Sequence, residues 1–315
     1  MQNSVEISTL DEVSLDDRKN VNEISYWLKV LNRPNGWHYY LDQLWILEEL
    51  KKNNIRTGDT IIDAGAGQGV MQYLLAARGY NVISIDFSPR RRPLRTRGIF
   101  TIKGNGEKNI SYKHKYMNVI SYEGNLFIRR ISKLFSFFTF KGLRYFSKRL
   151  LNEFNSFIFY IFELLFKDHS LYGEITYIRA PFHQLPKTLL RANALYSISA
   201  IEHSDIDIFQ ENIDSLLSLC RDNAPVLITT SLSDTDETTY DNKVEGWCFS
   251  TDFLISYFPN AFMSIDKLKC KKSITSNKPL WDKLDDYYSN DEYYGYGEGL
   301  RANIPYLPIY IKLIR

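Results

Sequence analysis

Short apolar runs alternate with longer amphipathic stretches along most of the chain. Seven short runs predict β-strands, because apolar and β-branched residues fill them and turn residues bound them. These runs are residues 60–64, 81–86, 174–180, 194–199, 224–232, 261–270 and 307–315. Apolar residues at helical spacing predict helices over residues 23–53 (with a break at 34–36), 70–78, 205–222 and 250–258. The alternation predicts an α/β fold with a doubly wound, seven-stranded, mostly parallel sheet.

The chain divides into four consecutive parts. They are an N-terminal helical cap (1–58), the first part of the α/β domain (59–97), an aromatic, basic insertion (98–173), and the rest of the domain (174–315) with a tyrosine-rich loop at 282–306. The first 22 residues are polar, so we expect them to be ragged. The insertion falls between the second and third strands, and its helices are expected to lie outside the sheet.

Composition narrows the function classes. The 315 residues carry a formal net charge of only +2, which disfavours nucleic acid as a partner. The three cysteines are far apart and form no CxxC pair, and no cluster of His, Cys, Asp and Glu has metal-ligand spacing, so no metal is expected. The chain shows neither a secretory signal nor a run of about 18 apolar residues, so we expect a cytoplasmic protein.

The residues after the first strand carry the strongest chemical signal. Asp63 closes that strand, Asp86 closes the second, and glycines stand at alternate positions between them, at 65, 67 and 69. Glycines let a ligand approach the backbone closely, and a carboxylate can accept two hydroxyl hydrogen bonds at once. Val70 replaces the third glycine of a dinucleotide fingerprint, and no phosphate-binding loop motif is present. The pattern therefore disfavours NAD, FAD and nucleoside triphosphates.

The pattern D-x-G-x-G-x-G resembles the first motif of class I S-adenosylmethionine (SAM)-dependent methyltransferases. Residues 196–205, YSISAIEHSD, resemble the fourth-strand segment of that family, and residues 224–231 resemble its fifth strand. The resemblance covers residues 40–95 and 174–315. It implies the strand order 3-2-1-4-5-7-6, with the last strand antiparallel in a terminal hairpin and a helical insertion between strands 2 and 3.

The resemblance implies SAM as the cofactor and S-adenosylhomocysteine (SAH) as the product. The cofactor-binding residues that it implies are Asp63, Gly65, Ala66, Gly67, Gly69, Asp86, Phe87, Phe182 and Ser199. Asp86 matches the acid that takes both ribose hydroxyls. Pro181 stands where the family carries an acid that reaches the adenine amine. The adenine contact is therefore expected from the backbone or from a neighbour, at Phe182, His183 or Gln184.

Two histidines are candidates for the base that removes a proton from an acceptor hydroxyl. His203 follows the fourth predicted strand beside the expected cofactor pocket, and imidazole has a suitable pKa. His38 is the second candidate, and His183 is a further one. The alternative for His203 is a capping or packing role near Ser204. The aromatic residues at 37, 39 and 40 either close over the methionine end of SAM or pack in the core.

The insertion and the tyrosine-rich loop bear on the acceptor. Residues 126–168 are dense in Phe, Leu and Ile and carry eight basic and three acidic residues, which predicts amphipathic helices. Three interpretations stay open: a lid that also contacts the inner face of a membrane peripherally, a subdomain that packs on itself, and a contact within a homodimer. Tyrosines between polar neighbours at 282–306 suit stacking on a sugar, or belong to a solvated loop.

These features predict O-methylation of a saccharide or a lipid-linked glycan. One alternative keeps methyl transfer but changes the acceptor to a membrane lipid or a small metabolite. The other is a non-catalytic module with the SAM-binding fold that serves as a partner for another enzyme. Binding of SAM and SAH separates the enzymes from a module that has lost its cofactor.

Overall fold

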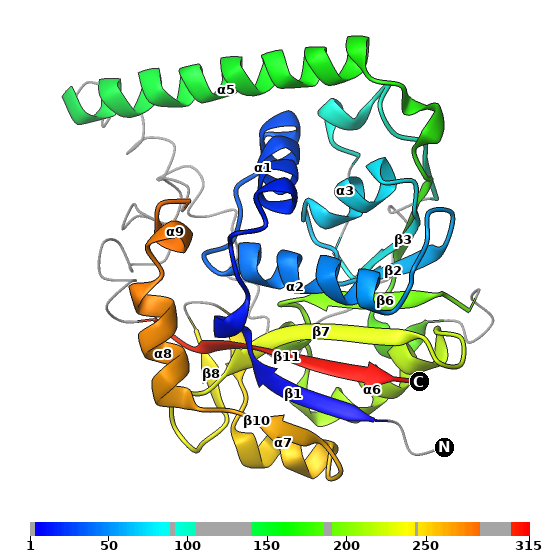
Figure 1. Ribbon diagram of the computed structural model, residues 1–315, viewed down its shortest axis with the longest axis vertical. Coiled ribbons are helices and arrows are strands. Elements are labelled where there is room, and N and C mark those ends of the chain that lie inside the picture. Colours follow the sequence, from blue (N-terminus) through cyan, green and yellow to red (C-terminus); the bar gives the residue numbers. More distant parts are fainter. Residues whose placement is uncertain (1–3, 89–91, 105–139, 186–190, 243–244, 284–303) are drawn as a thin grey trace, which may run out of the picture.

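The computed structural model describes residues 4–88, 92–104, 140–185, 191–242, 245–283 and 304–315. Among these residues, nine strands form one sheet (Figure 1). In spatial order the strands are β4 (Ile102–Lys103), β5 (Ile175–Arg179), β3 (Asn81–Asp86), β2 (Thr60–Ala64), β6 (Ala194–Ile198), β7 (Pro225–Leu232), β11 (Leu307–Ile314), β1 (Val5–Thr9) and β10 (Phe262–Ser264).

The sheet confirms the predicted doubly wound order. Strands β5, β3, β2, β6 and β7 pair in parallel, and β11 runs antiparallel to β7. Parallel strands that are covered on both faces appear in a sequence as continuous apolar runs. This explains why the central strands were predictable. The sheet differs from the expectation by two added strands, with β4 at one edge and β1 inserted between β11 and β10.

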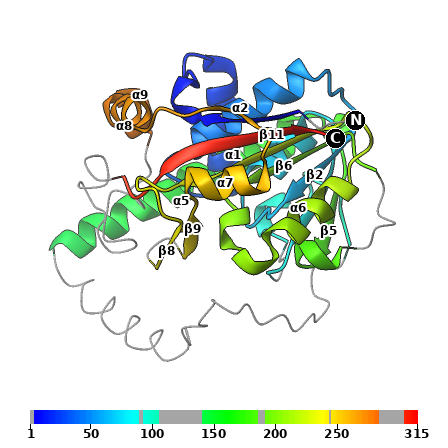
Figure 2. The ribbon, with the colours of Figure 1, turned by 90° about the horizontal axis from the view of Figure 1, so that it is seen from below.

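Helices cover both faces of this sheet. The described helices are α1 (Arg18–Leu31), α2 (Tyr39–Lys52), α3 (Met71–Ala77), α5 (Phe140–Phe166), α6 (Phe209–Ser218), α7 (Thr251–Tyr257), α8 (Lys267–Ser276) and α9 (Lys278–Trp281), of which α5 lies on α1 rather than on the sheet. Figure 2 shows α2 on one face and α6 and α7 on the other. The predicted break in the first helical stretch is confirmed, because α1 ends at Leu31 and α2 begins at Tyr39.

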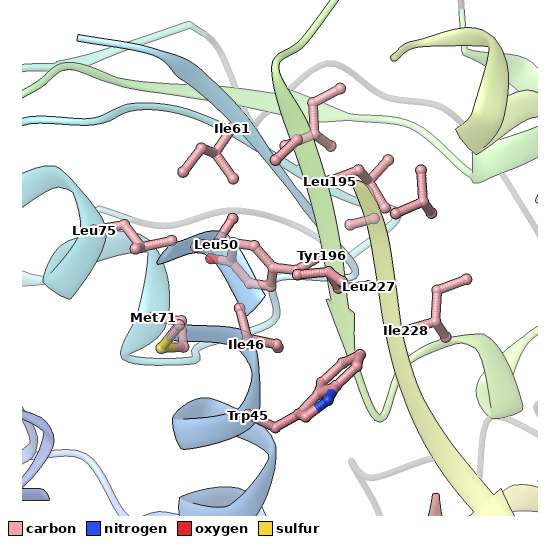
Figure 3. Packing of buried hydrophobic residues seen from close by; sticks show 14 of the residues in the cluster. Trp45, Ile46, Leu50, Ile61, Met71, Leu75, Leu195, Tyr196, Leu227 and Ile228 are labelled. Carbon is pink, nitrogen blue, oxygen red and sulfur yellow. The ribbon is translucent and has the colours of Figure 1, made fainter. Parts of the chain in front are cut away.

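The core is centred where α2 packs on the middle of the sheet. Figure 3 shows Ile46 and Leu50 of α2 on the same side of the sheet as Tyr196 of β6, while Leu195 of that strand points to the other side. These side chains are all almost fully buried. Burying one large apolar side chain stabilises the fold by about 1.5–3 kcal/mol. This packing holds the carboxyl ends of the central strands, and therefore the site described below, on a rigid base.

Both ends of the chain differ from the expectation. Residues 5–9 are not ragged: β1 pairs with β11 along its whole length, from Val5 opposite Leu313 to Thr9 opposite Ile309. The predicted terminal hairpin was wrong in detail, because β1 separates β10 from β11. Residues 261–270 were predicted as one strand, but β10 ends at Ser264. The Asp266 side chain accepts a hydrogen bond from the backbone N–H of Lys269 and so starts α8 instead.

The predicted insertion contributes β4, α5 and a short 3-10 helix, His169–Leu171. β4 pairs in parallel with β5, so this part of residues 98–173 joins the sheet. α5 is a long helix that runs along the outer side of α1 (Figure 1). Residues 105–139 lie outside the described part of the chain, as do residues 284–303 of the tyrosine-rich loop.

Candidate functional site

A cavity of about 380 Å³ opens at the carboxyl ends of β2, β3, β5 and β6. In a doubly wound sheet this is the edge at which ligands bind. Its volume lies within the range of about 300–1,000 Å³ that is common for small-molecule sites. Every cofactor-binding residue expected from the sequence lies in its wall, namely Asp63, Gly65, Ala66, Gly67, Gly69, Asp86, Phe87, Phe182 and Ser199.

Two glycines of the turn after β2 have different physical tasks. Gly65 has a φ of +75°, and a Cβ placed on it would lie 2.2 Å from the Cβ of Ala200. Its hydrogen is therefore needed for the turn to pack against the residue after β6. Gly67 has a φ of +46°, but a Cβ there would meet only the carbonyl oxygen of Gly65, at 3.9 Å. Packing within the described residues therefore does not require glycine at 67, although this residue lines the cavity.

Asp86 is fixed at the wall of the cavity by backbone groups. The N–H of Gly67 donates to its Oδ2 at 2.7 Å, and the N–H of Ser88 donates to its Oδ1 at 2.7 Å. The Ser88 hydroxyl also donates to Oδ1, at 2.5 Å. These contacts tie the acid after β3 to the glycine turn after β2. A carboxylate held in this way is preorganised to accept hydrogen bonds from the hydroxyls of a ligand.

Buried polar atoms in the wall indicate a polar ligand. The Ser199 hydroxyl and the amide nitrogen of Asn212 are buried and have no hydrogen-bond partner in the described part of the chain. A buried polar group in this state costs about 1–3 kcal/mol. Ser199 also has a left-handed backbone, with a φ of +43°. A ligand that accepts from Asn212 and bonds to Ser199 would remove that cost.

The residues after β5 close one side of the cavity. Pro181 precedes a short 3-10 helix, Phe182–Gln184, and leaves no acid there. The Phe182 ring approaches the glycine turn, since its Cζ lies 3.4 Å from a Cβ position on Gly65. α6 holds this segment, because the Ser215 hydroxyl donates to the carbonyl oxygen of Phe182 at 2.5 Å. Asn212 comes from the same helix, and the sequence offered no signal for it.

His203 lies in the cavity wall with a defined tautomer. Its Nδ1 lies 2.8 Å from the backbone carbonyl oxygen of Glu245. A carbonyl oxygen only accepts, so Nδ1 carries the hydrogen, and Nε2 of the neutral ring presents a lone pair. The capping role considered above belongs instead to Asp205, whose side chain accepts from the N–H of Asp207. The geometry therefore suits His203 as a proton acceptor.

Glu202 beside it is a buried acid. Its side chain accepts a hydrogen bond of 3.0 Å from the Thr230 hydroxyl. Burial raises the pKa of the Glu202 carboxyl, and the hydrogen bond from Thr230 opposes that rise in part. The raised pKa favours the neutral acid, which makes Glu202 a poor candidate for a permanently charged partner of His203.

His38 does not lie in the cavity wall. It is fully buried, with Nδ1 2.6 Å from Asp42 Oδ2 and Nε2 3.1 Å from the Tyr306 hydroxyl. Both ring nitrogens are engaged, so His38 is not placed to take a proton from a ligand in this cavity. Trp37 stacks on Trp281 at a centroid distance of 5.8 Å.

Tyr39 and Tyr40, the other two aromatic residues of the segment 37–40, lie in different environments. Tyr40 is buried, and its hydroxyl lies 3.0 Å from the Ser25 hydroxyl, which supports the core-packing alternative for it as for Trp37. Tyr39 does line the cavity. His183 lies in the cavity wall too, and the Gln184 amide nitrogen lies 3.1 Å from its Nε2.

A hairpin that the sequence did not reveal covers part of the cavity. Its strands are β8 (Thr239–Asp241) and β9 (Gly246–Cys248), and Figure 2 shows them apart from the large sheet. Tyr240 and Glu245 of this hairpin line the cavity. A Cβ on Gly246 would lie 3.2 Å from Nδ1 of His203, so the hairpin packs directly on the imidazole. Its strands are too short to give a periodic signal.

Three further observations concern the described residues as a whole. They contain no group of three His, Cys, Asp or Glu side chains that could hold a metal ion. No helix among them is long and apolar enough to cross a membrane. The cysteines at 220, 248 and 270 are free and buried, and burial raises the pKa of each thiol to about 12.

Comparison with solved structures finds remote likenesses. One is the 1,6-didemethyltoxoflavin-N1-methyltransferase of Burkholderia thailandensis, solved with its substrate and SAH (12% identity, TM-score 0.39, 95% of this chain and 82% of that chain). Another is a Galdieria sulphuraria protein named as a sarcosine dimethylglycine methyltransferase without an established activity (12%, 0.44, 93% and 98%). A third is the [4+2]-cyclase SpnF (10%, 0.43, 99% and 98%). No family model and no curated protein matches the sequence. The case for a function therefore rests on the cavity itself.

Proposed function

We propose that this protein is a SAM-dependent methyltransferase. The observation that carries the proposal is the wall of the cavity, in which the backbone N–H of Gly67 in the glycine turn donates a hydrogen bond to the Asp86 carboxylate. The sheet order supports it, because it is the order that the resemblance of the glycine motif implies. A dinucleotide-binding oxidoreductase is less compatible, since Val70 replaces the third glycine of that fingerprint.

The described residues fit an adenosyl cofactor. Asp86 would accept from the ribose hydroxyls, and the open side of Gly67 leaves space for the backbone of the turn to approach the ligand. The Phe182 ring offers an apolar face for the base, and the amide of Asn212 offers a donor to a ring nitrogen. Asn212 would thus supply the polar contact that the proline at 181 cannot make.

In this proposal the protein positions the methyl acceptor and removes a proton from its hydroxyl group. SAM supplies a methyl group on a positively charged sulfur, so the acceptor needs only alignment and, if it is a hydroxyl, loss of a proton. His203 would take that proton on Nε2 while its Nδ1 hydrogen stays on the carbonyl oxygen of Glu245. A base in this role contributes about 10²–10⁴-fold to the rate.

We further propose that the acceptor is a hydroxyl of a saccharide, free or linked to a lipid. Tyr39 and Tyr240 bring two tyrosine rings to the cavity wall, and the hairpin of Tyr240 also holds His203. Tyrosine combines an apolar face with a hydroxyl, which suits the two kinds of surface of a sugar ring.

The test measures cofactor binding and methyl transfer separately. Calorimetry with SAM and with SAH is expected to give one site for each. Purified protein with methyl-labelled SAM is then expected to label a saccharide, either in an oligosaccharide extract or in the glycan released from extracted lipids. Binding without transfer to any extract would favour the non-catalytic module, and label that stays on the lipid after its glycan is released would favour the lipid acceptor. Absence of binding to both SAM and SAH would contradict the proposed function.

A further inference from the structure

Helix α5 packs some apolar side chains against the core, among them Phe159 and Leu164, but exposes many others. From residue 150 onward, eight of its large apolar side chains are about half exposed or more, from 48% for Phe162 to 71% for Phe166. The exposed set is Leu150, Leu151, Phe154, Phe157, Ile158, Phe162, Leu165 and Phe166. We call these eight side chains the α5 apolar face. An ordinary surface helix buries its apolar side against the protein and leaves polar residues outside.

Polar contacts fix this orientation. Glu163 is buried and accepts hydrogen bonds from the hydroxyls of Tyr26 and Tyr172. Ser156, also buried, donates to the backbone carbonyl oxygen of Lys29 and accepts from Arg95.

A salt bridge adds to these contacts. Glu153 lies 2.8 Å from Arg95 and accepts from Asn32 at 2.6 Å. These bonds satisfy the polar residues of α5 on its protein side. The helix could bury the α5 apolar face against the protein only by rotating about its axis, and that rotation would break these bonds.

Most of the exposed large apolar side chains are concentrated on this one helix. Within the described residues, thirteen large apolar side chains are exposed, and eight of them belong to the α5 apolar face. Isolated exposed apolar residues need no explanation, but a contiguous patch marks an interaction site. At 1.5 Å of rise per residue, positions 150–166 extend over about 25 Å. Figure 1 shows the helix straight and at the outer edge of the molecule, beyond α1.

Charge indicates what covers this face. Residues 140–167 contain five basic residues, at 141, 144, 148, 149 and 167, and two acids, Glu153 and Glu163. Both acids are engaged on the protein side, as described above. The described outer positions of α5 therefore carry no carboxylate. Lys29 of α1 adds a cation close by, with its Nζ 5.2 Å from the centre of the Phe159 ring.

We infer that the α5 apolar face docks on the surface of an anionic lipid bilayer, with the helix axis parallel to it. A straight ridge of Phe and Leu on a helix whose sequence is rich in basic residues matches the boundary between acyl chains and anionic headgroups, where interfacial helices lie about 5–10 Å deep. A second copy of the chain is a poorer partner, because pairing two α5 helices brings together two segments with an excess of basic residues. The inference does not depend on the proposed methyl transfer.

The test is co-sedimentation of the full chain with vesicles of phosphatidylcholine alone and with 30% phosphatidylglycerol. The test variant combines Phe154→Gln, Phe162→Gln and Phe166→Gln. The matched control combines Phe262→Gln and Leu268→Gln, which are 70% and 83% exposed and lie outside α5. We expect the wild type and the control to sediment with anionic vesicles, and the test variant to bind at least tenfold more weakly. High salt and neutral vesicles should also weaken binding.

Three results would overturn the inference. The first is a wild type that stays in solution with anionic vesicles, or a test variant that binds as well as the control. The second is a wild-type dimer, measured by light scattering without lipid, that the test variant converts to a monomer while vesicle binding is unchanged. The third is a melting temperature of the test variant well below that of the control, which would show that the chain itself covers the face.

Discussion

Replacing Gly67 by alanine distinguishes an effect on ligand binding from an effect on folding. The structure leaves space for the added methyl group, since a Cβ at residue 67 has no neighbour closer than 3.9 Å. The folding cost is then limited to holding alanine at a φ of +46°, which is about 1–2 kcal/mol. This corresponds to a fall in melting temperature of a few °C for a domain of this size. Binding should suffer more, because Gly67 lines the cavity and the proposed ligand approaches the backbone of this turn.

The expected loss of affinity is about 10- to 100-fold for SAM and for SAH, or roughly 1.4–2.8 kcal/mol. The assay is calorimetry, with melting temperature measured on the same preparations. Gly58→Ala is the matched control, since Gly58 also has a positive φ, at +90°, and a Cβ there meets nothing within 4 Å. It precedes β2 and does not line the cavity. The control should lose stability but keep full affinity.

Two outcomes would refute this reasoning. If Gly67→Ala binds SAH as tightly as the wild type, the cofactor does not approach this side of the turn. If both glycine variants lose affinity in proportion to their loss of stability, the effect is one of folding and says nothing about the cavity.

Three other variants test neighbouring parts of the account. Asp86→Ala should weaken SAM binding by about 1.5–3 kcal/mol, the value for lost charged hydrogen bonds, and unchanged calorimetric affinity would contradict the ribose assignment. His203→Ala should lower turnover in the labelled-methyl assay by about 10²-fold or more with little effect on SAM affinity, and wild-type turnover would remove His203 from the role of base. Glu202→Gln tests the raised pKa of the Glu202 carboxyl. A carboxyl whose pKa is higher in the folded than in the unfolded state lowers the free energy of unfolding as the pH rises. This fall begins near the ordinary pKa of 4.5 and ends above the pKa in the folded state. The variant should therefore show a smaller fall than the wild type over that pH interval in denaturant titrations, and identical slopes would show that the pKa is not raised.

The central strands and the residues that line the cavity after β2 and β3 could be predicted because their signals are local. A strand buried on both faces needs an apolar run, and the glycine turn with acids at 63 and 86 occupies a short stretch of chain. β1 could not be predicted in this way. Its residues, VEIST, alternate in burial, and its partner β11 lies about 300 positions away. Only the assembled sheet supplies the hydrogen bonds that order it.

The choice between histidines and the role of Asn212 depended on tertiary packing. His38 and His203 are equally good bases by residue type, yet one is enclosed by Asp42 and Tyr306 and the other faces the cavity. Asn212 stands in an amphipathic helix and looks like an ordinary polar position. Its importance comes from the segment 182–184, against which α6 packs. No spacing in the sequence encodes that contact.

The claim that this cavity holds an adenosyl group is tested most directly by a crystal structure after soaking with SAH. The account predicts SAH in the cavity, with its ribose hydroxyls on Asp86, its base beside Phe182 and a ring nitrogen within hydrogen-bond distance of the Asn212 amide. Saturating SAH that leaves the cavity empty, or that binds elsewhere on the protein, would contradict the account.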